Sequence, residues 1–246
     1  MNHRVALQIP ASVILAASLS TVCLPQSNMS RTTITHVRPD MLTEWVDLQK
    51  NEVVLALKKA GVKSRTVYSS GLFGNAYEYV ILTPMEHFAD FDAGNPLTKA
   101  LGQATSARLG EKLRKCTVSA KSFQSTLLDS LSNPAPNNEP PQIIVTVRVR
   151  VIPGKMQDFE NVIKTDVLPV YKKAKVTYTV RRRGLGTNTN DVTLSTGYAK
   201  FADMDGGNPL VRALGQEGAA KVLAKLTGVA NLIDTAVRTR VADLSF

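Results

Sequence analysis

The residues best suited to chemistry in this 246-residue chain are arginines that alternate with other residues in strand-like segments. They form three i, i+2 pairs: Arg148 with Arg150, Arg181 with Arg183, and Arg238 with Arg240. Because successive side chains of a strand point to opposite faces, the two members of each pair share one face. Guanidinium groups gathered in this way suit carboxylate or phosphate ligands.

From this pattern we predict that Arg148, Arg150 and Arg183 contribute to a site for an anionic ligand. In the segment 143–152, valines alternate with the arginines and are expected to face helices, which leaves the arginines on the other side of the strand. The alternative is structural. Some of these arginines would lie at strand ends, pair with acids such as Glu78 and reach water.

His36 is the candidate catalytic residue. It aligns with Arg150 at a spacing of 114 residues, so we expect it on the same side of its own strand, where it could act as a base. A lone histidine without an identified partner is more often merely tolerated. Tyr79 is a further candidate ligand contact, because it shares a strand face with Tyr77 and aromatic side chains can line a pocket.

Acids and amides also recur, as Asp90, Asp92 and Asn95 and again as Asp203, Asp205 and Asn208. Such carboxylates could bind a cation or transfer protons. Each set, however, precedes a proline that opens a helical pattern, which favours turn and capping roles. No histidine pair or acid cluster has the spacing of a metal site. We therefore predict neither a metal nor a cofactor.

These residues lie within an internal repeat. FADFDAGNPLTKALGQ (88–103) and FADMDGGNPLVRALGQ (201–216) are identical at 12 of 16 positions without a gap, at a spacing of 113 residues. Upstream, Pro39 and Pro153 correspond at a spacing of 114, so one residue slips between them and the block. The chain therefore contains two copies of one module.

Each module shows the same series of hydrophobic patterns. In the second, segment 143–152 alternates as a strand, 155–174 carries a helical stripe that Pro169 should bend or end early, and 176–183 and 191–199 read as a hairpin. A helix capped by Asn208 and a strand near 233–242 follow. The first module repeats this order, with Cys116 expected in the core and a last strand near 117–125.

The fold class that follows is α+β: two tandem ferredoxin-like βαββαβ repeats forming a fused pseudo-dimeric α+β barrel. We place the repeats at residues 31–128 and 142–246, and a Pro- and Asn-rich linker at 129–141. The two halves of one chain are expected to pair with each other, which gives a monomer.

The order of elements, the Pro-Gly-Lys-Met start of a helix at Pro153–Met156 and the Phe-Ala-Asp turn after the third strand resemble the dimeric α+β barrel superfamily. That group includes the antibiotic-biosynthesis-type monooxygenases. The resemblance implies two facing four-stranded sheets, helices outside and a pocket in or beside each unit. Its members include cofactor-free oxygenases, haem-degrading enzymes, isomerases, cyclases and plain ligand-binding domains, so the fold does not settle the function.

The N-terminal segment has a short basic start and an apolar middle, which is typical of a secretory signal over residues 1–26. A membrane anchor or a lipoprotein processed at Cys23 is the alternative. We expect export to the periplasm or outside the cell, with no stable membrane span after processing. The formal net charge is +10, which favours anionic ligands, while export argues against nucleic acid as a partner.

The leading hypothesis is an exported barrel that binds a small, anionic organic molecule. One alternative is a cofactor-independent monooxygenase or isomerase that acts in the same pocket. Another is a structural or interaction module whose interior is filled by side chains, with no ligand.

Overall fold

The computed structural model describes residues 28–136 and 139–246, so the predicted signal peptide over residues 1–26 lies outside the described residues. The first half has the order strand, helix, strand, strand, helix, strand. Its elements are β1 (Met29–Val37), α1 (Leu42–Leu48), α2 (Val54–Lys59), β2 (Thr66–Phe73), β3 (Glu78–Pro84), α3 (Pro96–Leu101), α4 (Gln103–Lys115) and β4 (Thr117–Leu127).

The second half follows the same order. Its elements are β5 (Ile143–Val151), α5 (Met156–Val162), α6 (Leu168–Lys173), β6 (Thr177–Arg183), β7 (Asp191–Tyr198), α7 (Pro209–Thr227) and β8 (Ala230–Arg240). The strands predicted at 143–152, 176–183 and 191–199 are thus confirmed to within a residue, while β8 begins three residues before the predicted 233.

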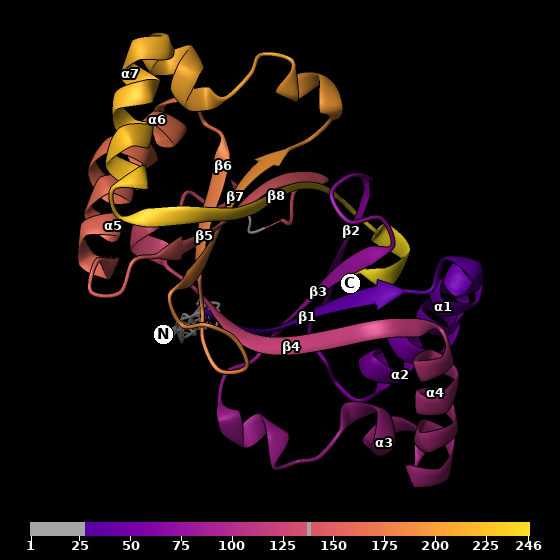
Figure 1. Ribbon diagram of the computed structural model, residues 1–246. Coiled ribbons are helices and arrows are strands. Elements are labelled where there is room, and N and C mark those ends of the chain that lie inside the picture. Colours follow the sequence, from indigo (N-terminus) through magenta and orange to yellow (C-terminus); the bar gives the residue numbers. More distant parts are fainter. Residues whose placement is uncertain (1–27, 137–138) are drawn as a thin grey trace, which may run out of the picture.

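The eight strands close into one antiparallel barrel in the order β1-β3-β2-β8-β5-β7-β6-β4. The α+β class and the barrel are therefore confirmed. β2 pairs with β8 and β4 pairs with β6, and these two seams join the halves through three residue pairs each. The helices of each half cover the outside of that half's own strands, on opposite sides of the barrel (Figure 1).

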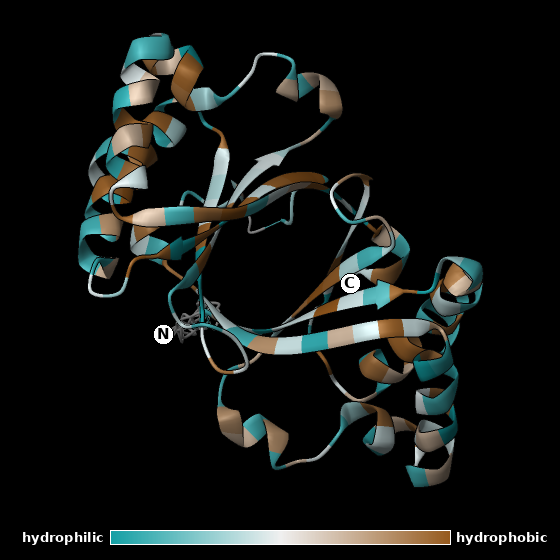
Figure 2. Cartoon of the chain, viewed as in Figure 1, coloured by the Kyte–Doolittle hydropathy of each residue, from teal (hydrophilic) through white to brown (hydrophobic). Residues whose placement is uncertain are grey.

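Strand alternation separates an apolar outer face from a polar interior. Val151, Val180 and Val192 are fully buried against the helices of the second half, and Val37 and Val67 are buried in the corresponding core of the first half. Hydrophilic and hydrophobic residues are accordingly intermixed along the strands in Figure 2. The inward-facing positions are mostly occupied by residues with hydroxyl or charged groups, so the interior of the barrel is polar and not a hydrophobic core.

The first helix of each half contains one π-helical turn. It lies at Gln49–Val53, between α1 and α2, and at Ile163–Val167, between α5 and α6. The two turns lie 114 residues apart, the spacing of the repeat in this region. Pro169 was expected to bend its helix or end it early, and the helix does not end there, because helical structure continues to Lys173. The wider π turn directly before Pro169 accommodates the missing N–H, and the first half has the same turn without a proline.

The repeated block acts as a turn and cap, as its residue types favour. Asn95 Oδ1 accepts from the Leu97 amide at 2.9 Å, and Asn208 Oδ1 accepts from the Leu210 amide at 2.8 Å. Asp90 Oδ2 accepts from the amides of Glu86 and His87, and Asp203 Oδ2 accepts from the Lys200 amide at 3.1 Å. The carboxylates of Asp90 and Asp203 thus accept hydrogen bonds from backbone amides, which supports the capping role. Cys116 is fully buried, as expected.

The segment between the halves is partly anchored. Asn133 exchanges two backbone hydrogen bonds with Tyr178 on β6, at 2.6 and 2.8 Å, and Ser132 Oγ accepts from the Val180 amide at 3.0 Å. Within the described part of the chain, no helix is both long and apolar enough to cross a membrane.

Candidate ligand-binding cavity

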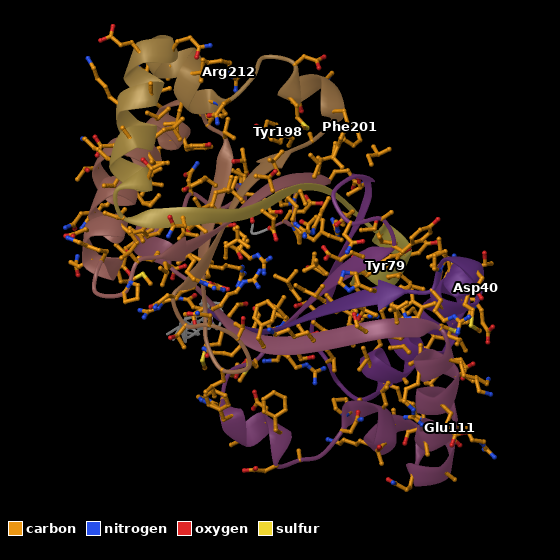
Figure 3. The ribbon with its side chains drawn as sticks, in the orientation of Figure 1. Asp40, Tyr79, Glu111, Tyr198, Phe201 and Arg212 are labelled. Atoms are coloured by element: carbon orange, nitrogen blue, oxygen red, sulfur yellow. The ribbon has the colours of Figure 1, made fainter. Side chains whose placement is uncertain are left out.

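One cavity of about 420 Å³ lies inside the barrel. All strands except β2 contribute to its wall, so it is built by both halves. The lining residues are Ile34, His36, Glu78, Ser119, Ala120, Lys121, Thr146, Arg148, Arg183, Thr193, Asp234 and Arg238. This volume is within the range of small-molecule sites. In Figure 3, nitrogen-bearing side chains extend into the space inside the barrel.

Glu78 connects the two halves inside this cavity. Arg238 Nη2 donates to its Oε1 at 2.6 Å, and His36 Nε2 lies 3.1 Å from its Oε2. The Ser70 hydroxyl adds a hydrogen bond at 3.3 Å. Burial alone would raise the pKa of Glu78, but the hydrogen bond and charge of Arg238, together with His36, hold its pKa below the usual value. Glu78 is therefore ionised near neutral pH.

Both ring nitrogens of His36 have partners. Nδ1 lies 2.9 Å from Ser119 Oγ, while Nε2 is near both Glu78 and the Asn75 amide nitrogen, the latter at 3.0 Å. A protonated Nε2 donates to Glu78, whereas an unprotonated Nε2 accepts from Asn75. A carboxylate that orients a histidine in this way is a common feature of acid–base sites.

Arg183 is held in the cavity without a carboxylate partner. Its guanidinium carbon lies 4.5 Å from the centre of the Phe123 ring, and its Nε donates to Thr193 Oγ1 at 3.2 Å. Among the residues that the structure describes, it forms no ion pair. Burial, reinforced by the positive charge of Arg148, lowers the pKa of Arg183 to about 10.

The structure brings together three of the five predicted site residues. His36, Arg148 and Arg183 line the cavity, and Arg148 pairs there with Asp234. Arg150 does not line it, because it lies near the end of β5 and pairs with Asp191 at 2.7 Å with half of its side chain exposed. Arg150 therefore has the structural role given above as the alternative, an ion pair near the end of a strand. The expected ion pair between an arginine and Glu78 is also present, and Arg238 forms it.

Tyr79 lies on the wrong side of its strand for the cavity. Glu78 points inward, so the next residue points to the helices, where Tyr79 is buried with its ring 4.4 Å from that of Trp45. Figure 3 labels Tyr79. It is a core residue of the first half, and we remove it from the site.

The two halves differ at equivalent positions. His36 pairs across β1 and β3 with Glu78, and Arg150 pairs across β5 and β7 with Asp191, at repeat spacings of 114 and 113 residues. The acid position is thus kept in both halves, whereas the cationic partner changes from a titratable imidazole to a permanent charge. The second half closes this position with an ion pair, and the first keeps a histidine.

Sequence reasoning missed several cavity residues. Lys121 and Asp234 occupy corresponding positions of β4 and β8, at the repeat spacing of 113, and both point inward. Their strand parity could have indicated this face, but their strands were predicted only by approximate bounds. Asn75, which contacts His36 from the turn between β2 and β3, was not singled out from the sequence.

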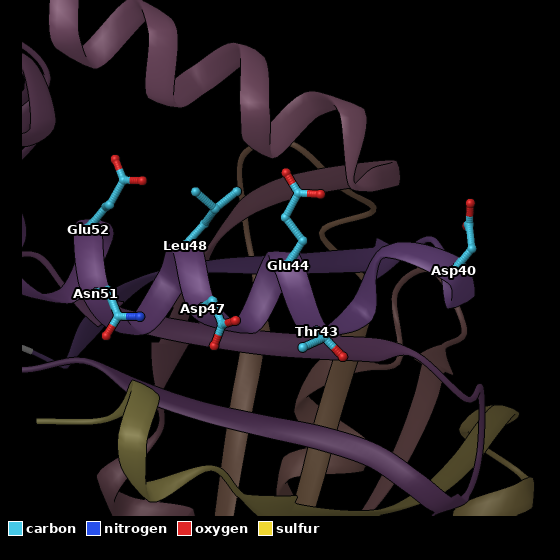
Figure 4. A pocket seen from close by; sticks show the side chains of 7 residues that line it. All are labelled: Asp40, Thr43, Glu44, Asp47, Leu48, Asn51 and Glu52. Atoms are coloured by element: carbon cyan, nitrogen blue, oxygen red, sulfur yellow. The ribbon is translucent and has the colours of Figure 1, made fainter.

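A second hollow lies outside the barrel, along α1 (Figure 4). This open groove of about 500 Å³ is lined by Asp40, Thr43, Glu44, Asp47, Leu48, Asn51 and Glu52. Glu52 pairs with Lys112 at 3.2 Å, and Asp40 pairs with Arg38 at 3.0 Å. In the described residues, no group of three or more acids, histidines or cysteines is arranged to hold a metal. The groove is an acidic helix surface.

Comparison with known proteins supports the fold. No protein-family model and no curated protein matches the chain. Among solved structures, an anthrone oxidase-like protein is similar with a TM-score of 0.58 at 10% identity, over 88% of this chain and 92% of that one. A mutant chlorite dismutase from Candidatus Nitrospira defluvii is similar with a TM-score of 0.55 at 11% identity, over 90% and 94% of the two chains.

A candidate monooxygenase from Lactobacillus acidophilus has a TM-score of 0.53 at 11% identity, over 88% of this chain and 94% of that one. At such identities the likeness defines the fold alone. That fold is a closed antiparallel barrel of eight strands with helices on its outside. The activity has to be argued from the cavity.

Proposed function

We propose that this protein binds a small organic anion in the cavity between its two halves. The observation that carries the proposal is Arg183, a buried cation that faces the cavity and has no carboxylate partner in the described chain. A charge held in this way is costly unless something neutralises it, and an anionic ligand does so through charge-assisted hydrogen bonds. The basic composition of the chain agrees with such a ligand.

The direct test is a native mass spectrum of the protein purified from its own host. We expect a retained small molecule, and we expect Arg183→Met to lose it. Arg182→Met is the matched control, because Arg182 lies on the same strand but is exposed on the other face. Equal retention by both variants would reject the cavity as the binding site.

A second candidate function is proton abstraction in the same cavity, as in a cofactor-independent monooxygenase or isomerase. The His36–Glu78 pair favours it, since a carboxylate-oriented imidazole suits a general base. In this scheme His36 takes a proton from the bound substrate, and Arg183 stabilises the anion that forms. The fold shared with an anthrone oxidase-like protein and a candidate monooxygenase adds support by analogy only.

Replacing His36 by Gln separates the two candidates. If His36 is the base, His36→Gln should lower turnover by about 10²–10⁴-fold while ligand retention is kept. If the protein only binds its ligand, neither the native chain nor the variant should convert it. Conversion at the native rate by His36→Gln would exclude this residue as the base.

A haem does not fit the cavity and takes no part in this proposal. His36 and His87 are the histidines of the described chain. The cavity around His36 is lined mostly by charged side chains, not by the apolar surface that a porphyrin would need. His87 is exposed and caps a short turn.

We also propose that the two ferredoxin-like repeats, at 31–128 and 142–246, arose by tandem fusion and that the chain is a monomer that mimics a dimer. Size-exclusion chromatography with light scattering tests the assembly, and a dimer mass would contradict it. Export with removal of residues 1–26 remains part of the proposal. N-terminal sequencing of exported material tests it, and an intact Met1 on a cytoplasmic protein would reject it.

A further inference from the structure

We infer that the ligand of the cavity carries two negative charges, an inference that rests on the anion binding proposed above. The cavity wall contains four cationic side chains, Lys121, Arg148, Arg183 and Arg238, and two carboxylates, Glu78 and Asp234. Counted together, these six side chains give the cavity wall an excess of two positive charges. A ligand with two negative charges balances this excess, whereas a monoanion balances half of it.

Two of the four cations are already neutralised. Arg238 donates to Glu78 at 2.6 Å, and Arg148 pairs with Asp234. Each carboxylate is thus engaged by a guanidinium of its own.

The remaining cations are Arg183 and Lys121. Asp191 is another acid whose charge reaches Arg183, but it is bonded to Arg150 at 2.7 Å. The Arg183 face covers the Phe123 ring and its Nε is bonded to Thr193, so its two terminal Nη groups have no partner in the described chain. Lys121 likewise forms no ion pair with any described residue.

These two free cations belong to one wall of the cavity. Arg183 lies on β6 and Lys121 on β4, two strands that pair directly through Ser125 and Arg183. Phe123, over which Arg183 is stacked, is two residues from Lys121 on the same face of β4. One small ligand can therefore contact both, either as a dicarboxylate with one group on each cation or as a single phosphate- or sulfate-like group between them.

Isothermal titration calorimetry of the intact protein with simple anions tests the inference. Malonate represents dicarboxylates, sulfate represents a single tetrahedral dianion, and acetate is the monoanion, all at one ionic strength near neutral pH. We expect the better dianion to bind at least about tenfold more tightly than acetate. Malonate above sulfate indicates a dicarboxylate ligand, and the reverse order indicates a phosphate- or sulfate-like group.

Substitutions of Arg183 and Lys121 test whether these two cations bind the two negative charges of the ligand. Arg183→Met and Lys121→Met should each reduce the affinity of the preferred dianion to about that of acetate, while Arg182→Met, outside the cavity, should leave it unchanged. Dianion and acetate affinities within about twofold of each other would overturn the inference. If Arg183→Met then weakened the binding of the dianion and of acetate equally, the proposed anion binding would be supported, but a ligand with two charges would not. If no probe bound the native protein, both proposals would fall.

Discussion

Arg183 has a charge that the folded chain does not neutralise. The sequence predicted that Arg148 and Arg183 contribute to one site, but could not show that Arg148 pairs with an acid and Arg183 does not. Burial lowers the pKa of Arg183 to about 10, so below that pH its charge costs stability, and the cost is relieved only as the pH rises through 10 towards the ordinary arginine value. Binding is therefore favoured at the expense of the stability of the ligand-free protein.

It follows that Arg183→Met should stabilise the ligand-free protein by about 1 kcal/mol, because Met keeps the contact with Phe123 and removes the uncompensated charge. Urea unfolding in an anion-poor buffer measures this change. Adding malonate or sulfate should then raise the stability of the native protein more than that of the variant. A variant that is destabilised in the anion-poor buffer would show that the charge is satisfied within the fold.

Glu78 should make the protein sensitive to acid. Its folded-state pKa is held below the ordinary value, so its contribution to stability is complete above the unfolded value of ~4.3 and is lost as the pH falls through the lowered one. Glu78→Gln leaves Arg238 without its anion and should cost about 2 kcal/mol or more near neutral pH, while flattening the dependence on acid pH.

Glu86→Gln is the control for that change, because Glu86 pairs with Lys63 on the surface with both side chains more than half exposed. It should change stability by about 0.5 kcal/mol or less. Equal effects of the two substitutions in chemical denaturation would contradict the central position of Glu78.

Among the elements, the β6–β7 loop fixes the wall that carries Arg183. Gly186 has a φ of +90°, and a Cβ there would lie 2.6 Å from the Ser122 carbonyl oxygen on β4. The amide of Gln124 also donates to the Leu185 carbonyl at 2.9 Å. The loop therefore rests directly on the backbone of β4, beside the seam that joins β4 to β6.

Gly186→Ala should therefore destabilise the protein by more than the conformational cost of a left-handed alanine, which is about 1 kcal/mol. Gly94→Ala is matched to it, since Gly94 also has a positive φ of +81° but no atom near the added Cβ. Thermal unfolding of the two variants isolates the contact with β4. If they lost equal stability, the loop would not be packed on that strand.

Local sequence signals predicted the elements well where they alternate clearly. Segment 143–152 alternates Val with polar residues, and its inward face was read correctly for Arg148. Strand β3 instead carries Tyr79, Val80, Ile81 and Leu82 in a row. Because both of its faces are apolar, the sequence does not show which faces the helices, and Tyr79 was placed on the wrong one.

At the scale of the whole molecule, the cavity exists only because the barrel closes. Arg183 approaches Phe123, and Arg238 approaches Glu78, across the seams between the halves. Neither contact can be read from a repeat considered alone, since strand order across a seam is a property of the closed sheet. This is why the repeat and the capped helices were predictable, whereas the pairing of charges was not.

Two copies of one module would contain two equivalent cation positions, but only the first half has a titratable histidine there. Arg150 and Asp191 close the second position, whereas His36 and Glu78 border the cavity. We therefore predict a single ligand in each chain, bound on the wall formed by β4 and β6.

The most direct measurement is an anomalous difference map from crystals soaked in selenate, a dianion that can be located by its selenium. We predict one strong peak per chain inside the barrel, within hydrogen-bonding distance of Arg183 and near Lys121. Peaks confined to the outer surface, or an equal second peak at Arg150 and Asp191, would contradict a single anion site at Arg183.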